Sequence, residues 1–286
     1  MRSPSLPVRS ASLLLCLLVA APMAHADERA DALLREVERS TKSLASLGAR
    51  LQVTLITQNV SARPVDPQQS RQSDPGFGQG NEPVSFTYAG TVKLQRPNLE
   101  RIELLDPIRQ LIASDGRSLW TLLPTHEYIK NPADPQGKSP SAYGPILMFF
   151  APETARTAGV LPMAGVINSD DFATRYLGKE RVVLKIARSK QDPPGTPAGN
   201  ETVSEEFDVV EVRQLRPTQQ AVKLYINAAK IVTRVVSETR RGGVSTIQDV
   251  SLLNLKPAQK FDSAEFAFEL PADARPYVFQ PTPARK

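Results

Sequence analysis

Between residues 28 and 47 the apolar positions follow the period of a helix. The segment reads ERADALLREVERSTKSLASL, and its leucines, valine and alanines recur largely three or four positions apart among charged residues. This spacing places the apolar side chains along one face of an amphipathic helix. We therefore predict a helix over about 28–46, with Gly48 just past its end, because glycine commonly follows the last helical turn.

After Gly48 the period changes to two. Leu51, Val53 and Leu55 alternate with polar residues, which predicts a strand. The connections that follow are too short for helices, and Asp115-Gly116 is a strong hairpin signal, so we expect an antiparallel meander that curls around a core or cavity. Its further strands are predicted at 84–95, 99–105, 108–114, 117–123, 126–130, 172–178, 180–187, 205–215, 219–227, 230–239 and 244–255.

Three segments interrupt this strand pattern. Residues 61–83 and 188–203 are rich in proline, glycine and polar side chains, and we predict that both are flexible inserts. Between them, the segment 143–150 reads YGPILMFF, a compact apolar cluster. We predict a short helix there that packs on the sheet or closes over it, although these residues could equally be ordinary core.

The N-terminus has the three regions of a secretory signal peptide. Two arginines precede an apolar run at 11–21, and Ala24-His25-Ala26 has small residues at the positions of a cleavage site. The run is shorter than the roughly 20 apolar residues that cross a bilayer. We expect cleavage after Ala26, which removes Cys16, the single cysteine, and leaves 27–286 as one domain exported to the periplasm. An uncleaved anchor and lipid attachment at Cys16 are the two alternatives.

Charge and side-chain chemistry favour binding over catalysis. The formal net charge is +5, removal of the signal segment lowers it by two, and no basic cluster is present, so nucleic acid is not an expected partner. His126 is the one histidine after residue 26, and it lies in a predicted turn. The acidic residues lack the spacing of a metal site, and no glycine-rich phosphate loop occurs. We expect a monomeric binding protein without a cofactor.

A more specific pattern lies between residues 90 and 131. The segment begins GTVKLQRPNLERIEL, continues with Asp106-Pro107, and reaches LIASDGRSLW at 111–120 before Pro124 and another strand. In order, spacing and residue types this segment resembles the outer-membrane lipoprotein carrier family, LolA. Phe261, Phe266 and Phe268 resemble the closing segment of that family. The resemblance extends over 28–275, with inserts longer than a typical member has.

The resemblance implies both a fold and a function. The fold would be mainly β: an incomplete antiparallel β-barrel with an N-terminal helix and a short helical lid. The function would be to carry lipoproteins, or another lipid, between the inner and outer membranes by holding acyl chains in an apolar cavity. The implied partners are those acyl chains, an inner-membrane lipoprotein-releasing ABC transporter and an outer-membrane receptor.

The resemblance also implies a lipid site. Arg96 matches a family arginine implicated in opening and closing the cavity, although an arginine at a strand end could simply be solvated. Glu100 stands where typical members carry an aromatic residue, which puts an identical handover of lipoproteins in doubt. A regulatory module of the same fold that binds a membrane-bound regulator is the alternative function, and an envelope hydrolase is a third. The lid would consist of Ile146, Leu147, Met148, Phe149 and Phe150.

Overall fold

The computed structural model describes residues 27–59, 83–106, 110–133, 172–186, 202–215, 221–241 and 244–278. The expected signal segment and nearly all of the two predicted inserts lie outside these ranges. The elements in chain order are α1 (Glu28–Ser43), β1 (Ser46–Asn59), β2 (Val84–Gln95), β3 (Leu99–Asp106), β4 (Gln110–Asp115), β5 (Ser118–Leu122), β6 (Glu127–Pro132), β7 (Phe172–Lys185), β8 (Thr202–Gln214), β9 (Ala221–Ile226), β10 (Val232–Arg241), β11 (Val244–Pro257), the 3₁₀ helix η2 (Ser263–Phe266) and β12 (Arg275–Pro276).

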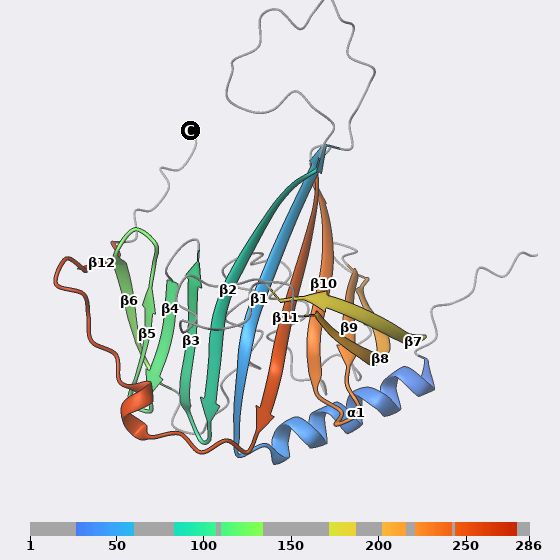
Figure 1. Cartoon of the computed structure of the whole chain (residues 1–286), viewed down its shortest axis with the longest axis horizontal. Helices are drawn as coiled ribbons and strands as arrows, with labels where there is room; N and C mark the ends of the chain where they lie inside the picture. The colour runs from blue at the N-terminus through green and yellow to red at the C-terminus, as the bar shows by residue number, and fades with distance from the viewer. Residues whose placement is uncertain are drawn as a thin grey trace, which may run out of the picture.

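All the strands belong to one open sheet with β1 near its centre (Figure 1). The order is β12-β6-β5-β4-β3-β2-β1-β11-β10-β9-β8-β7. Two meanders, β2–β6 and β7–β11, therefore meet on either side of β1, which pairs with β2 and β11. Within the described ranges, neighbouring strands are antiparallel except for β12 beside β6. The expected mainly β, antiparallel fold with an N-terminal helix is confirmed, and the sheet does not close into a barrel.

Two predicted boundaries were wrong. The strands expected at 172–178 and 180–187 form the single strand β7, whose register with β8 shifts between Tyr176 and Gly178. Gly178 has a φ of 106°, which explains why the alternation breaks without ending the strand. The helix ends at Ser43 instead of residue 46, and Gly48 lies inside β1.

The first glycine of the family-like motif has a steric role. The register between β2 and β3 shifts at Ala89/Gly90. A Cβ atom on Gly90 would lie 2.0 Å from the carbonyl oxygen of Glu103, so a larger residue would push the two strands apart. The predicted Asp115-Gly116 hairpin is also present, with Gly116 at a φ of 88°.

The two faces of the sheet are covered by different parts of the chain. We call the face on which α1 packs the helix face. The C-terminal segment 261–274 packs instead on the opposite face, where Trp120 contacts Tyr128 and Phe268 with ring centroids 5.8 and 5.9 Å apart. Trp120 therefore belongs to the packing of the fold and not to the helix face.

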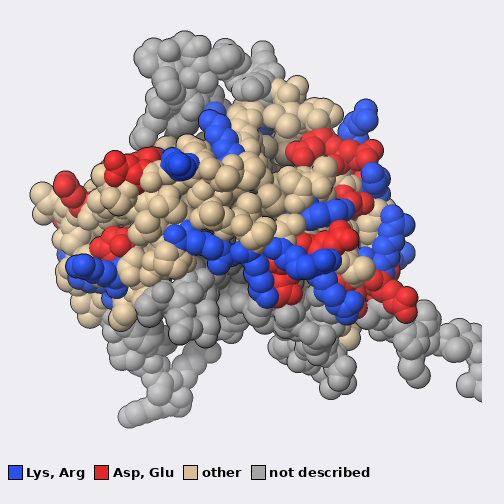
Figure 2. Space-filling view, turned by 90° about the horizontal axis from the view of Figure 1, so that it is seen from below, with Lys and Arg blue, Asp and Glu red and all other residues tan. Residues whose placement is uncertain are grey.

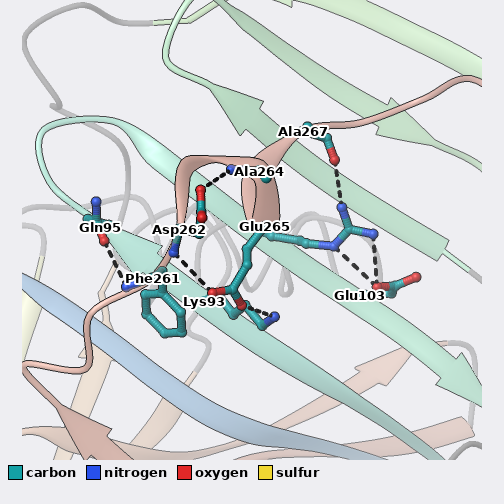
Figure 3. A network of polar contacts seen from close by, with 9 residues as sticks. Lys93, Gln95, Glu103, Phe261, Asp262, Ala264, Glu265 and Ala267 are labelled. Carbon is teal, nitrogen blue, oxygen red and sulfur yellow. Dashed lines mark hydrogen bonds and ion pairs between the residues drawn. The ribbon is translucent and has the colours of Figure 1, made fainter.

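Polar contacts attach the start of this C-terminal segment to β2 and β3 (Figure 3). Lys93 forms a 2.6 Å ion pair with Glu265, and Arg101 donates to the carbonyl oxygen of Ala267 at 2.9 Å while it also pairs with Glu103. Asp262 and Glu265 form a reciprocal capping box around η2. The segment is thus held on the side of the sheet away from α1.

Candidate functional site

The helix face carries the largest apolar cluster among the described residues. Its strand positions alternate with side chains on the opposite face, as the period of two predicts. Across the central strands the facing residues are matched row by row: Val53 lies opposite Tyr88 of β2 and Val250 of β11. The buried members of the cluster are Ala30, Leu33, Leu34, Val37, Leu47, Leu51, Val53, Val92, Ile102, Leu104, Ile112, Val210, Val212, Val222, Leu224, Ile226, Val232, Val235, Val250 and Leu252.

Helix α1 covers part of this face and is attached at its N-terminus to β7. Asp27 is the N-cap: its side chain accepts from the backbone N–H groups of Arg29 and Ala30 and, at 2.8 Å, from that of Tyr176. One turn further on, the buried Asp31 carboxylate accepts a 2.6 Å hydrogen bond from the Thr174 hydroxyl. In Figure 1, α1 runs beneath the β7–β11 half of the sheet and ends below β1.

Electrostatics strengthen the N-terminal attachment. The backbone N–H of Tyr176, with those of Ala30 and Arg29, holds the pKa of Asp27 below its usual range, although partial burial opposes the shift. A negative charge at this position also interacts favourably with the helix dipole. The carboxylate of Asp27 is therefore more stable in the folded chain than in the unfolded one.

A second polar cluster lies beside the same attachment. The Tyr176 hydroxyl donates to Asp208 at 2.8 Å, and Lys230 pairs with Asp208 at 3.3 Å and with Glu36 of α1 at 3.6 Å. Burial alone would raise the pKa of Asp208, but the hydrogen bonds from Tyr176 and Lys230 outweigh it, and that pKa is lowered. Lys230 thereby connects the middle of α1 to the sheet.

Arg96 attaches the C-terminal end of the helix. Its guanidinium donates to the main-chain oxygen of Leu44 at 2.8 Å and to that of Thr41 at 3.0 Å, and its backbone N–H donates to Ala45 at 2.9 Å. The last carbonyl groups of a helix are short of backbone donors, although that of Thr41 also accepts from the N–H of Leu44, and a cation beside them is favoured by the helix dipole. Arg96 thus holds α1 in place; it is not simply a solvated side chain.

The structure bears differently on the proposed lid and on Glu100. The proposed lid, 146–150, lies outside the described residues. Glu100 is only 4% exposed, and its register opposite Leu94 and Ser114 places it on the helix face. A carboxylate thus lies beside Leu94 and Ser114 on the helix face, at the position where the family resemblance places an aromatic side chain in typical members.

Sequence reasoning missed several polar residues of this face, among them Asp31, Thr174 and Gln248. Asp31 and Thr174 join elements 143 residues apart. A signal existed for Asp31, because the helical period places it beside Ala30 and Leu34 on the buried side. Gln248 of β11 is 3% exposed and lies opposite Leu55 and Ser237 on the helix face, and no comparable pattern marked it.

His126 has a different position and role. It lies at the turn before β6, on an exposed part of the chain, and its Nδ1 contacts the Asp273 carboxylate, whose pKa this contact lowers. In the described part of the chain, no group of three or more His, Cys, Asp or Glu side chains has the arrangement of a metal site. None of the helices in that part of the chain is long and apolar enough to cross a membrane.

The underside of the molecule, where α1 lies, has a mixed charge (Figure 2). Lys and Arg side chains gather there with Asp and Glu among them. The exposed basic residues of α1 include Arg35 and Arg39, and Lys42 is paired with Glu38 at 2.6 Å. The surface around the helix therefore presents both signs of charge.

Comparisons with known proteins bear on the segment that carries the motif. Residues 77–143 match the family model "Outer membrane lipoprotein carrier protein LolA". No curated protein matches the chain. Among solved structures, lipoprotein LppX of Mycobacterium tuberculosis is 12% identical with a TM-score of 0.37, over 83% of this chain and all of that one.

Two further solved structures have similarly low sequence identities and TM-scores. A LolA superfamily protein of Nitrosomonas europaea is 14% identical with a TM-score of 0.31, over 84% of this chain and 97% of that one. An outer membrane lipoprotein-sorting protein domain of Vibrio parahaemolyticus is 10% identical with a TM-score of 0.33, over 84% and 96%. Scores this low do not bear on function. The match at 77–143 confirms the resemblance to the LolA family that the motif predicted over this segment of the chain.

Proposed function

We propose that the protein is an exported lipid carrier that holds acyl chains against the helix face of its sheet. The observation that carries this proposal is the continuous apolar cluster on one face of β1–β4 and β8–β11, together with a helix fastened over part of it by polar contacts at both ends. The cargo would be lipoproteins, or another acylated lipid, moved between the inner and outer membranes.

Physical chemistry supports an acyl ligand on this face. Each CH₂ group that leaves water contributes about 0.8 kcal/mol, so a chain of ordinary length needs a broad apolar surface and little else. The helix face supplies neighbouring Leu, Ile and Val side chains from many strands. A carrier must also release its cargo, which requires that protein contacts replace lipid contacts at small net cost.

The polar contacts of α1 suit such an exchange. Its two ends are held by hydrogen bonds from Arg96 and Thr174, and a helix fastened at its ends can loosen without unfolding the sheet. We further propose that Ile146, Leu147, Met148, Phe149 and Phe150 act as a lid, since methionine and phenylalanine suit a surface that repacks. Arg96 would then be a positioning residue of the carrier.

The family match and the N-terminal pattern support the cellular setting. The match at 77–143 is to a carrier family, and the first 26 residues have the layout of a signal peptide. We propose that the chain acts in the periplasm as a single domain, loaded at the inner membrane by a lipoprotein-releasing transporter and unloaded at an outer-membrane receptor.

Photo-crosslinking tests the binding face directly. The full chain is incubated with a fatty acid that carries a diazirine, irradiated and digested, and the labelled peptides are identified by mass spectrometry. We expect labels on helix-face residues such as Leu51 and Val250, competed by unlabelled lipid. Labels confined to the opposite face, around Phe207 and Tyr225, would contradict the proposal.

Two adjacent residues of β1 provide a matched pair of variants. Leu55 and Ile56 are both half-buried, but only Leu55 packs against the helix-face cluster. Leu55→Asn should reduce labelling while Ile56→Asn leaves it unchanged, with circular dichroism confirming that both variants fold. A chain that takes no label but captures a membrane-bound regulator would support the alternative function of a regulatory module.

A further inference from the structure

Gln248 occupies an unusual environment. The residue lies in β11, and its register places it between Leu55 of β1 and Ser237 of β10, with its side chain on the helix face. The next residue of β11 on this face is Val250, which lies opposite Val53 of β1. The residue is only 3% exposed, so the amide is removed from water.

The amide of Gln248 is also unpartnered. Among the described residues, neither its nitrogen nor its oxygen has a hydrogen-bond partner. A buried primary amide has two donors and one acceptor to satisfy, and leaving them unpaired opposes folding. Native chains seldom retain such a group without a purpose, and a ligand that supplies the missing partner is one such purpose.

The position of Gln248 along the face indicates which part of a ligand it would meet. In the adjacent row of the helix face, Val53 and Val250 are fully buried. In its own row Leu55 is half-buried, and the residue paired with Leu55 on β2, Phe86, is 52% exposed. On the other side of Gln248, Ser237 and Val222 are buried, so the row passes from buried to exposed at Gln248 in the direction of β2.

The chemistry of the row limits the ligand group further. Phe86, Leu55, Gln248, Ser237 and Val222 follow one another across β2, β1, β11, β10 and β9, and all are uncharged. A carboxylate or phosphate would lack a cation in this row. A neutral acceptor such as an ester carbonyl suits the amide N–H donors and needs no counter-charge.

We propose that Gln248 recognises the ester carbonyl of an acyl chain, and that the ligand class is an ester-linked glycerolipid or the diacylglyceryl group of a lipoprotein. In such lipids the ester marks the boundary between hydrocarbon and polar head, which matches the boundary between buried and exposed parts of the helix face. The hydrogen bond would set how deeply the chains enter. This inference rests on the proposed lipid-carrier function.

The test compares two probes with identical chains. Dioleoylglycerol carries ester carbonyls, and its dialkyl ether analogue lacks them; each is titrated into delipidated full-length protein, and bound lipid is counted by native mass spectrometry. We expect the wild type to prefer the ester by about tenfold, the effect of one well-made hydrogen bond. Gln248→Leu should lose this preference and retain its affinity for the ether.

Matched variants separate a binding role from a structural one. Gln58→Leu makes the same change on an exposed position of β1, on the other face, and should keep the preference. Because Gln248→Leu removes a buried unpaired amide, its thermal midpoint should equal or exceed that of the wild type. A lower midpoint together with a retained ester preference would show that the amide serves the fold, and would overturn the inference.

The outcomes also distinguish this inference from the function on which it rests. Equal binding of ester and ether lipids by the wild type would overturn the role of Gln248 and leave the carrier function standing. Binding of neither probe by the wild type would contradict the carrier function and the inference with it.

Discussion

The guanidinium of Arg96 donates to the main-chain oxygen of Leu44, 2.8 Å away, so a residue from the turn after β2 completes the last turn of α1. The N-terminal end of the same helix is joined to β7 by Asp27 and Asp31. The helix is therefore fastened at two distant points of the sheet, one on each side of β1. A single substitution at either attachment should therefore loosen that end of the helix.

Replacing Arg96 should loosen the C-terminal end. Arg96→Ala removes the hydrogen bonds to Thr41 and Leu44, and we expect a loss of about 1 kcal/mol in the free energy of unfolding, measured in urea. Acyl-chain exchange should become faster, because the helix opens more often. Arg117→Ala, at an exposed turn position, is the control. An Arg96 variant with unchanged stability and exchange would show that this contact does not hold the helix.

The effects of substituting Asp31 and Thr174 on the free energy of unfolding should be coupled, because the two side chains are in contact. Thr174→Val leaves the Asp31 carboxylate buried without this hydrogen bond, and we expect a cost of about 1–3 kcal/mol. Asp31→Ala alone should cost a similar amount, and the double variant less than the sum. A double-mutant cycle measures the difference, and strictly additive effects would argue against a direct interaction.

The N-cap Asp27 should make the free energy of unfolding depend on pH in the acidic range. Because the folded chain lowers the pKa of Asp27, its carboxylate adds stability above the ordinary aspartate pKa of about 3.9. That contribution is lost as the pH falls through the lowered value. Asp27→Ser keeps an N-cap oxygen without the charge, so its unfolding free energy should fall less steeply with acid than that of the wild type. Parallel curves between pH 6 and 3 would contradict this origin.

The single tryptophan reports on the C-terminal segment. Trp120 is the one tryptophan in the sequence, and it packs against Phe268 on the opposite face. Phe268→Ala should expose the indole and shift its emission to longer wavelength, whereas Leu270→Ala, at an exposed position, should not. Added lipid should leave the emission of the wild type nearly unchanged, because Trp120 lies away from the helix face; a large shift would place the lipid on the wrong face.

Glu100 should limit the affinity for acyl chains. Glu100→Leu places an apolar side chain beside Leu94 on the helix face, and a buried leucine contributes about 1.5–3 kcal/mol. We expect tighter binding of a fluorescent fatty acid than in the wild type. Weaker binding would indicate that the carboxylate itself contacts the ligand.

Much of the fold followed from local patterns, whereas most of the site did not. The period of two located β2 at its exact bounds, since its side chains alternate between the two faces. The division of β7 was mispredicted because Gly178 interrupts that alternation without interrupting the pairing. Arg96 was singled out by its motif, but its partners on α1 lie more than 50 residues away, and no local pattern reveals such contacts.

If acyl lipid occupies the helix face, the protein isolated from its own cells should contain it, and its lipid content can be measured. The full chain is purified without detergent, extracted with organic solvent and analysed by mass spectrometry beside an exported control protein prepared in the same way. We predict acyl lipids in near-stoichiometric amount, reduced in the Leu55→Asn variant but not in Ile56→Asn. A lipid-free wild type that also fails to bind added lipid would show that the helix face is not an acyl-lipid site.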